Sequence, residues 1–582
     1  MLGGGGANHQ GREIVRHLRS SLILCAMATL LAFGVPPQAK CAEKAPGVFD
    51  VRDYGAAGNG KTLDTPAINK AIQACNKAGG GTVVFTPGEY VTGTFVMLSH
   101  VTLRLEAGAV IKGSTNLADY KLKSEFNLDN QSRQHGEGLR LGLIVATQAE
   151  DIAIVGHGVI DGRGTYFVGE TPHNPTDYEA RLTREGNDYL SVKSVPWEGP
   201  LKPTMPWNDR PGVLIVLSSC KNVVIRDVTL KDSHNWTLHL SGSEDIVISG
   251  IRIVNNLMIP NNDGINITAK NARISDCYIS AGDDAIAANG CENLTVTNCT
   301  LVSRSSGIRF GGGKYCTFQN LVIRDSNRGI GIYGSADHVL FSDILMQTRL
   351  FNGNWWGKSE PIYIMSRGAR AGSGSAAASP GGASIVDVRF SNIMAESEAG
   401  ILIYGGGPGA IRNLSFDRMK LRLKGGPGSA VVGGNFDMRG TSSGGGIVKH
   451  DIPALFCQNV DGLQIRGFEV EWADSLPDYF AEAIYCEHFT NLIIDGFIGR
   501  QAHPSTGATV VLKDGNKVSI SNSEAAPETG TFLSLDGVKD LRSFTNNDLS
   551  NAKEAISPAQ SKFRIVSGND LGEGSNQASK TK

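Results

Sequence analysis

The sequence predicts an all-β protein: a right-handed single-stranded parallel β-helix with a short N-terminal capping helix and long side loops. Ten-residue units recur about every 22 residues from position 221 onward, and each alternates apolar and polar residues as a short strand does. Gly supplies 72 of 582 residues, enough for frequent turns. Because no amphipathic helix separates consecutive units, stacking each short strand on the next coil is the arrangement that buries them.

The repeat units read KNVVIRDVTL at 221, EDIVISGIRI at 244, KNARISDCYI at 270 and ENLTVTNCTL at 292. Their fifth, eighth and tenth positions stay apolar, as expected for side chains that point into a common core. Related units at 150, 412, 461 and 490 extend the pattern over most of the chain. A propeller would need blades of about 40 residues, and a leucine-rich horseshoe its own Leu and Asn framework.

An amphipathic helix is expected at 65–78, where it would cap the open end of the stack. Thr65 is a cap residue, Pro66 suits the first turn, and four apolar residues fall on one face: Ile68, Ala71, Ile72 and Cys75. Three interruptions of the repeat, at 164–212, 350–383 and 423–455, predict side loops of the kind that hold ligands on a solenoid.

Residues 1–42 have the pattern of a secretory signal peptide: arginines, then the apolar run 22–33, then a small-residue stretch. The run is shorter than the roughly 20 residues that a membrane span needs. Lys40 disfavours a lipid anchor on Cys41. We therefore expect a secreted or periplasmic protein, with a β-helix catalytic domain at 43–575 and a disordered tail at 576–582.

Composition excludes several classes of partner. The net charge is −2, from 55 basic and 57 acidic residues, which gives no electrostatic case for nucleic acid or a membrane surface. Eight cysteines remain after residue 42, an even number that permits disulfides, but Cys277 and Cys299 fall at apolar repeat positions and are expected to be buried. No CxxC pair occurs, and we expect a monomer without metal or cofactor.

Two acidic motifs carry the candidate chemistry, Asn261-Asn262-Asp263-Gly264 and Gly282-Asp283-Asp284. Asp263 lies seven residues before one repeat unit and Asp284 eight before the next, so both should occupy nearly the same place on consecutive coils, about 5 Å apart. Three carboxylates on one patch cannot all ionise cheaply. One should hold a proton while another stays charged, as acid/base hydrolysis of a glycosidic bond requires, although Asp and Asn are also common turn residues.

PNNDGINI at 260–267 and GDDAIAA at 282–288 resemble the polygalacturonases of glycoside hydrolase family 28, and GHGVIDGRG at 156–164 is similar to the same pectin-degrading β-helix superfamily. The resemblance implies that the protein hydrolyses a polysaccharide or oligosaccharide without a metal and with inversion of configuration at the cleaved bond. It implies Asp283 as the general acid, Asp263 and Asp284 as the residues that bind and activate water, and Asn261 as a residue that shapes the site.

Two family motifs are altered. Ser306 stands where the resemblance would place a His, and Gly331-Ile332-Tyr333 stands for Arg-Ile-Lys, so the groups that would bind a galacturonate carboxylate are missing. Arg309 and Arg328 lie close by in sequence and either supply a cation from another direction or are solvated turn residues. Weak activity on unsubstituted polygalacturonate is expected.

Trp355 and Trp356, in the second interruption, suit stacking on a sugar face. That interruption also carries Lys358 and Glu360, and we expect it to cover one end of the site and make the enzyme exo-acting. A β-helix polysaccharide lyase, with calcium and a basic residue, and a non-catalytic carbohydrate-binding solenoid remain alternatives. The retained three Asp residues favour the hydrolase over the binder.

Overall fold

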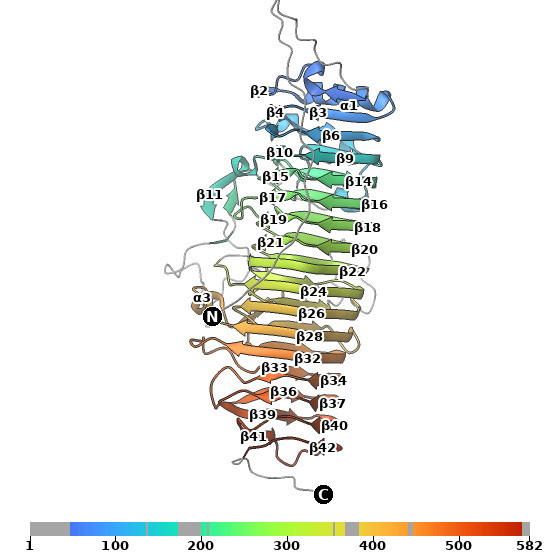
Figure 1. The fold of residues 1–582 in the computed structure, drawn as a ribbon. Coiled ribbons are helices and arrows are strands. Elements are labelled where there is room, and N and C mark those ends of the chain that lie inside the picture. The colour runs from blue at the N-terminus through green and yellow to red at the C-terminus, as the bar shows by residue number, and fades with distance from the viewer. Residues whose placement is uncertain are drawn as a thin grey trace, which may run out of the picture. The chain divides into compact units, whose positions relative to one another are not determined.

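The chain from Gly47 onward winds into stacked coils of short parallel strands, which form a right-handed parallel β-helix (Figure 1). The computed structural model describes residues 47–134, 138–172, 198–199, 201–205, 209–352, 355–366, 383–439 and 446–572. The signal peptide expected at 1–42, the tail at 576–582 and all but the last residue of the tract 372–383 lie outside these ranges. None of the helices in the described part is long and apolar enough to cross a membrane.

Each complete coil contributes a strand to three files, which we call A, B and C in chain order. File A contains β5 (Phe95–Val96), β8 (Ile144–Thr147), β13 (Ile215–Ser218), the first parts of β16 (Leu238–Ser249), β18 (Ile265–Ser275), β20 (Ile286–Thr297) and β22 (Ser306–Ser326), then β23 (Arg328–Ile332), β25 (Ile362–Ser366), β27 (Ile401–Gly405), β31 (Leu455–Gln458), β33 (Ile484–Glu487), β36 (Ala508–Lys513), β39 (Thr529–Asp536) and β41 (Ala552–Ser557).

File B contains β1 (Val48–Asp50), β3 (Gly81–Phe85), β6 (Val101–Leu105), β9 (Glu150–Gly156), β14 (Lys221–Arg226), the later parts of β16 to β22, then β24 (Ala336–Thr348), β26 (Ile385–Ser397), β28 (Ile411–Leu423), β32 (Val460–Trp472), β34 (Thr490–Asp495), β37 (Asn516–Ser521), β40 (Lys539–Thr545) and β42 (Ile565–Ser567). File C contains β2 (Asn59–Leu63), β4 (Gly88–Thr92), β7 (Ala109–Gly113), β10 (Val159–Asp161), β15 (Thr229–Lys231), β17 (Arg252–Val254), β19 (Tyr278–Ala281), β21 (Thr300–Ser303), the ends of β22, β24, β26, β28 and β32, and then β35 (Ile498–Gly499) and β38 (Glu524–Ala525).

The core is built from the apolar positions that the repeat predicts. Ile225, Ile248 and Ile274 are fully or almost fully buried, and Phe318, Phe341, Phe390 and Phe416 stack face to face on successive coils with ring centroids 4.8, 4.9 and 5.1 Å apart. These separations match the spacing of hydrogen-bonded strands. The prediction for the cysteines is confirmed as well, because Cys277 and Cys299 are 3% and 2% exposed and both are free thiols.

The expected capping helix is α1 (Thr65–Lys77), and its buried face contains all four predicted apolar residues together with Ala67. The helix begins at Thr65, so Asp64 and not Thr65 occupies the N-cap position. The Asp64 carboxylate accepts hydrogen bonds from the N–H groups of Ala57 and Gly58, and thereby fastens the chain entering the helix rather than the helix end.

The remaining elements belong to the side loops. They are β11 (Val168–Pro172) paired with β12 (Leu201–Pro203), β29 (Asn435–Asp437) paired with β30 (Ile447–Lys449), the helices α2 (Asn130–Gln134) and α3 (Ser429–Val432), and the 3-10 turns η1 (Val51–Tyr54), η2 (Leu117–Asp119), η3 (Lys123–Glu125) and η4 (Gly164–Phe167).

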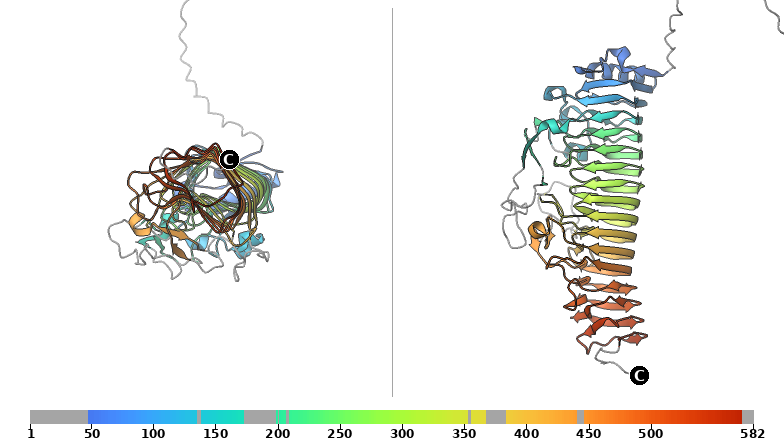
Figure 2. Two further views of the ribbon diagram at one scale, coloured as in Figure 1. Left: turned by 90° about the horizontal axis from the view of Figure 1, so that it is seen from below. Right: turned by 60° about the vertical axis from the view of Figure 1, so that its left-hand side comes forward.

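The long loops share a position in the coil. The described parts of 162–214, 349–361 and 424–454 all connect file C to file A, the same turn in which Asp263 and Asp284 lie. Figures 1 and 2 show β11 and α3 projecting from the same side of the stack. The fold therefore gathers these three connections in the file of turns that carries the candidate carboxylates.

The 50-residue step between the units at 336 and 386 is a single coil. β24 pairs directly with β26, and β25 lies within the interruption as a regular strand of file A. The extra length therefore falls partly between β24 and β25, at 349–361, and partly between β25 and β26, where residues 367–382 lie outside the described part of the chain.

Candidate active site

Asp263 and Asp284 occupy equivalent positions on consecutive coils. Ile265 pairs with Ile286, and the N–H of Gly264 donates to the carbonyl of Asp284 at 2.9 Å, which confirms the register predicted from the motif spacing. The same position, two residues before an Ile of file A, recurs on three further coils. The residues at this position are Asp263, Asp284, Ser306, Arg328 and Glu360.

Asp263 is 5% exposed and incompletely hydrogen-bonded. Asn266 Nδ2 donates to Asp263 Oδ2 at 2.9 Å, whereas Oδ1 is buried with no hydrogen-bond partner among the residues that the structure describes. Burial, followed by the charges of Asp283 and Asp284, raises the pKa of Asp263 well above its usual range. Native proteins satisfy most buried polar atoms, so this oxygen is an acceptor that remains available to a water or a ligand hydroxyl.

Asp283 is partly exposed, and its pKa, like that of Asp263, is raised. Burial, and next the charge of Asp284, raises the pKa of Asp283 to about 7. Asp283 Oδ1 accepts a hydrogen bond from the N–H of Asp284 at 3.0 Å. Near neutral pH this carboxyl group therefore retains its proton in a substantial fraction of molecules, which is the condition for a general acid.

Asp284 is surrounded by donors. Its Oδ1 accepts hydrogen bonds from Ser305 Oγ at 2.9 Å and from the N–H of Ser306 at 3.1 Å, and Arg309 Nε lies 3.5 Å from Oδ2. These contacts fix the orientation of the carboxylate. The Ser306 Oγ atom is buried and has no hydrogen-bond partner within the described residues, so it offers a second orphaned oxygen on the adjacent coil.

Arg309 is the cation that reaches the carboxylates. Its side chain is 34% exposed, donates to Asn289 Oδ1 at 3.0 Å and lies over the Tyr333 ring at 5.3 Å. The Tyr333 ring folds back over Gly331, where an added Cβ would lie 2.6 Å from a ring atom. The altered motif is thus a matched pair: a Gly at 331 makes room for the Tyr333 ring, and the ring supports Arg309 from the preceding coil.

Arg328 is neither solvated nor directed at the carboxylates. Its side chain is 1% exposed, forms ion pairs with Glu360 at 3.1 Å and Asp437 at 3.6 Å, and donates to the Tyr333 hydroxyl. Its guanidinium also lies 3.6 Å from the Tyr363 ring centroid. The interpretation of Arg328 as a solvated turn residue is therefore wrong, and its donors are already taken by the protein.

The tandem tryptophans differ in exposure. Trp355 is 5% exposed and donates its indole N–H to the Glu198 carbonyl at 2.7 Å, whereas Trp356 is 36% exposed and packs under Arg439 at 4.6 Å. Trp356 is consequently the more exposed member of the pair, and Arg439 covers part of its ring. Lys358 and Glu360 from the same loop are 5% and 2% exposed, so they serve the packing of this loop.

Asn261 and its neighbour shape the loop before Asp263. Asn261 adopts a left-handed backbone with φ of 57° and is half-buried. Asn262 is fully buried, donates to the Asn256 carbonyl at 2.7 Å and accepts from the N–H of Gly282 at 2.6 Å. Asn262 thus ties the Asp263 loop to the Asp283 loop, a role that the sequence reasoning missed.

Three further residues near the carboxylates were also missed. Trp236 precedes Thr237, whose N–H donates to the Asp263 carbonyl at 2.8 Å, so Trp236 lies one coil before Asp263. His239 is paired with Asn266 in file A and lies 5.3 Å from the Trp236 ring. The register of file A could have found them, because HNWTLHL at 234–240 aligns with NNDGINI one coil later.

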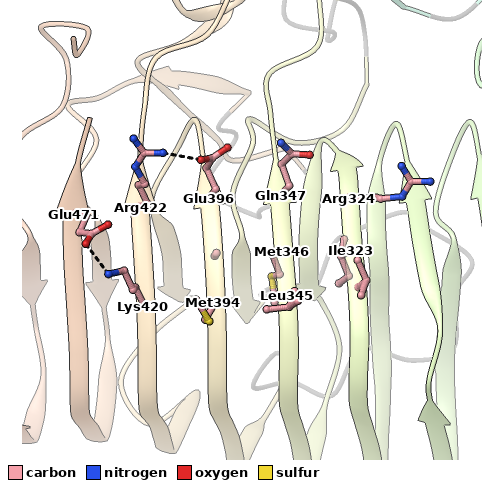
Figure 3. A pocket seen from close by; sticks show the side chains of 12 residues that line it. Ile323, Arg324, Leu345, Met346, Gln347, Met394, Glu396, Lys420, Arg422 and Glu471 are labelled. Carbon is pink, nitrogen blue, oxygen red and sulfur yellow. Dashed lines mark hydrogen bonds and ion pairs between the residues drawn. The ribbon is translucent and has the colours of Figure 1, made fainter. Parts of the chain in front are cut away.

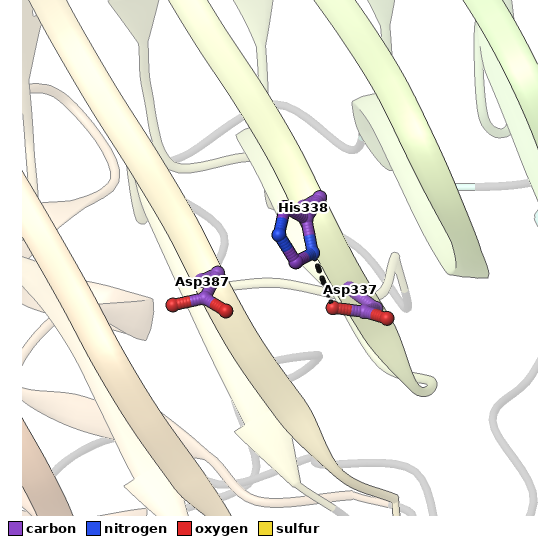
Figure 4. Close-up of side chains that lie close together, drawn as sticks. All are labelled: Asp337, His338 and Asp387. Atoms are coloured by element: carbon purple, nitrogen blue, oxygen red, sulfur yellow. Dashed lines mark hydrogen bonds and ion pairs between the residues drawn. The ribbon is translucent and has the colours of Figure 1, made fainter.

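Two other features of the surface lie away from this turn. A hollow on the outer face of file C is lined by apolar and charged side chains, including Leu345, Met394 and Arg422 (Figure 3), and includes none of the predicted site residues. Asp337, His338 and Asp387 bring ligand atoms within 4.8 Å of one another at the turn from file A to file B (Figure 4). All three are exposed or half-buried, and none belongs to the carboxylate patch.

The chain belongs to glycosyl hydrolases family 28, whose sequence profile matches residues 99–404. A second profile, rhamnogalacturonase A/epimerase, pectate lyase-like, matches residues 48–138. A probable polygalacturonase from Vitis vinifera is 32% identical over 307 residues, which cover 48% of this chain and 55% of that protein. An exo-poly-α-D-galacturonosidase from Dickeya chrysanthemi is 27% identical over 255 residues, 41% of this chain and 42% of that protein. The chain thus spans about half the length of the curated relatives it matches.

Among solved structures, the family 28 exopolygalacturonase of Yersinia enterocolitica superposes with a TM-score of 0.56 at 19% identity. The match covers 78% of this chain and 79% of that one. It supports the right-handed parallel β-helix as the fold.

Proposed function

We propose that the protein is an exported glycoside hydrolase that cleaves glycosidic bonds of a pectic or related polysaccharide by an inverting, metal-free mechanism. Asp283 acts as the general acid, and Asp263 with Asp284 binds and activates the water. The observation that carries the proposal is the unequal environment of three adjacent carboxyl groups. Two of them, Asp263 and Asp283, have raised pKa values, and the third is held by Ser305, Ser306 and Arg309.

The chemistry needs a proton at the leaving oxygen and a carboxylate at the water. Asp283 is partly exposed and carries its proton near neutral pH, so it suits the leaving group. The orphaned oxygens of Asp263 and Ser306 flank Asp284 on the neighbouring coils, where a water or a sugar hydroxyl would be held. Inversion follows if the two functions act from opposite faces of the sugar ring.

The decisive experiment compares reducing-sugar release by the wild-type protein and by Asp283→Asn over a panel of pectic and neutral polysaccharides. Release by the wild type alone supports the hydrolase, and proton NMR of the first-formed anomer then distinguishes inversion from retention. A product that absorbs in the ultraviolet would instead identify a lyase. Equal, near-zero release by both proteins on every substrate would favour the non-catalytic carbohydrate-binding alternative.

We further propose exo-action. The described part of the loop 349–361 packs on the coil that follows Ser306: Ser359 donates its N–H to Asn327 Oδ1 at 3.1 Å, and Glu360 pairs with Arg328. A loop on this side of the carboxylates would limit how far a bound polysaccharide can extend beyond the cleaved bond. Early release of mono- or disaccharide is expected, and a rapid fall in substrate viscosity would contradict it.

Export rests on the pattern of residues 1–42 alone. Sequencing the N-terminus of protein recovered from the periplasm or culture medium tests it. A mature N-terminus close to residue 43 is the expected result, and retention of residues 1–42 by the active protein in the cytoplasm would contradict it.

A further inference from the structure

A second pocket, of about 310 Å³, lies on the outer face of file A beyond the carboxylates. Its floor is formed by strands β27, β31 and β33, and one wall by the β29–β30 hairpin of the third insertion. The lining residues are Tyr404, Phe436, Met438, Val448, His450, Phe456, Gln458 and Glu487. None of these residues takes part in the carboxylate site, and none was singled out by the sequence.

The pocket combines the half-buried rings of Tyr404 and His450, a base of the buried rings of Phe436 and Phe456, and a few polar groups. The Phe436 ring lies 4.9 Å from Phe456 and stacks on His450 at 4.2 Å, and Phe456 stacks on Tyr485 at 5.4 Å. Glu487 is fixed by the Tyr485 hydroxyl, which donates to Oε2 at 3.0 Å. A sugar ring presents C–H groups to an aromatic face and hydroxyls to amide and carboxylate groups, so this combination fits a pyranose or furanose ring.

The charges around the pocket favour a neutral ring. Among the described residues that line it there is no Lys or Arg, and Glu487 is its acidic group. Lys513, on the next coil, lies 5.2 Å from the Tyr485 ring centroid. Tyr485 and Glu487 both raise the pKa of Lys513, so its charge is already engaged with Glu487. A uronate carboxylate would meet Glu487, because the two groups nearby that can be cationic are already engaged: His450 stacks on Phe436 with Nδ1 against the Asp451 carbonyl, and Lys513 faces Tyr485 and Glu487.

The hairpin links this pocket to the buried cluster around Arg328, two coils beyond Asp284. Alternate residues of a strand point to opposite faces, and in β29 Phe436 lines the pocket while the next residue, Asp437, accepts from the N–H of Gly357 at 2.7 Å and pairs with Arg328 and Arg439. Along file A, Arg309, Gly331, Tyr363, Leu402 and Phe456 follow one another in register, which places Phe456 four coils, or about 19 Å, from Arg309.

We propose that this pocket is a second carbohydrate-binding site, which holds a neutral sugar ring of the polysaccharide four coils beyond Arg309 and five coils beyond the coil of Asp284. The proposal rests on the proposed function for the nature of the ligand, but it makes no use of the catalytic carboxyl groups. It predicts that binding to neutral polysaccharide survives loss of catalysis and that catalysis on short substrates survives loss of the pocket.

Blocking the pocket tests this directly. Val448 is 41% exposed, so Val448→Trp fills the pocket without removing a buried side chain, and Val247→Trp, at a 38% exposed Val on file B, is the matched control. Binding is measured by isothermal titration calorimetry in the Asp283→Asn background, with neutral oligosaccharides of galactan, arabinan and xylan and with oligogalacturonate as probes. We expect one neutral probe to bind, and Val448→Trp to weaken it by about tenfold or more while Val247→Trp leaves it unchanged.

The outcomes separate this proposal from the proposed function. Unchanged binding in Val448→Trp, no binding of any neutral probe, or binding of oligogalacturonate that depends on Val448 would each overturn the second site, whatever the activity. Loss of hydrolysis in Asp283→Asn with Val448-dependent binding supports both proposals. Absence of hydrolysis in the wild type with Val448-dependent binding would refute the hydrolase and leave the second site standing. Equal melting temperatures of the two Trp variants exclude misfolding as the cause.

Discussion

Two charged clusters lie in the same file of C-to-A turns, two coils apart, and they are built in opposite ways. The cluster of Asp263, Asp283 and Asp284 brings like charges together with one partly exposed Arg309 beside them. In the second cluster, Arg328 and Arg439 are matched by Glu360 and Asp437. Buried charges that are paired serve the architecture, whereas buried like charges that raise one another's pKa are costly and mark a chemical site.

Asp283→Asn tests the first cluster and should have the largest effect on activity. Loss of a general acid typically lowers the rate by about 10²- to 10⁴-fold. The melting temperature should stay the same or rise, because the amide removes a like charge from the patch. Initial rates of reducing-sugar release measure the loss of activity, and a thermal melt of the same preparation measures the stability. A large fall in melting temperature would show that Asp283 has a structural role instead.

Arg328→Met tests the second cluster and should mainly affect stability. Removing one partner of a buried ion pair costs about 3–5 kcal/mol, because the opposite charges are left buried without a cation. Denaturant unfolding measures the loss. Glu360→Gln is the companion variant and should be less harmful, since Asp437 still pairs with Arg328. Wild-type stability of Arg328→Met combined with lost activity would show that Arg328 belongs to the chemistry after all.

The contributions of the two clusters to the free energy of unfolding should change with pH in opposite directions. The pKa of Asp283 is raised to about 7, and that of Asp263 is raised too. The folded state therefore binds more protons at these groups than the unfolded chain does. As pH rises from about 4 toward 7, the two groups destabilise the folded state increasingly. Burial alone would raise the pKa of Asp437, but the charge and hydrogen bonds of Arg439 and the charge of Arg328 outweigh it and lower that pKa, so Asp437 contributes stability that is lost as pH falls below about 4.

Thermal melts of the wild type and Asp283→Asn between pH 3 and 9 measure both effects. We expect the variant to lose less stability than the wild type between pH 4 and 8, and both to lose stability together below pH 4. Activity should fall as pH rises through about 7, because Asp283 then loses the proton that it donates. Activity that is constant from pH 6 to 9 would contradict the assignment of Asp283 as the acid.

The coil and the register of the carboxylates could be predicted from the sequence because both depend on the length of the repeat. Ile265 and Ile286 fix the strand pairing, and residues a constant number of positions away from them must stack. The buried cysteines and the capping helix were predictable for the same reason. These features are local patterns repeated at a fixed interval.

The second cluster could not be predicted, because it joins segments with no common period. Arg328 meets Asp437, which lies 109 positions later in a hairpin that follows two irregular loops. Trp355 donates its indole N–H to the carbonyl of Glu198, from another insertion far earlier in the chain. Contacts between insertions depend on loop conformation rather than repeat register, and so neither the burial of Trp355 nor the role of Arg328 had a signal in the repeat.

Arg309 connects the two clusters, and its replacement should give the smallest effect. Its side chain is partly exposed and its nearest approach to Asp284 is 3.5 Å, so solvent screens the pair, and Arg309→Gln should lower kcat/KM by about two- to fivefold on a neutral substrate. Arg309→Lys keeps the charge but loses the stacking on Tyr333, and it should recover part of that loss. On a uronate substrate the same pair of variants reports whether Arg309 replaces the missing cations of the altered motif. If it does, Arg309→Gln raises KM selectively for the charged substrate, and if both substrates respond equally, Arg309 acts only by orienting Asp284.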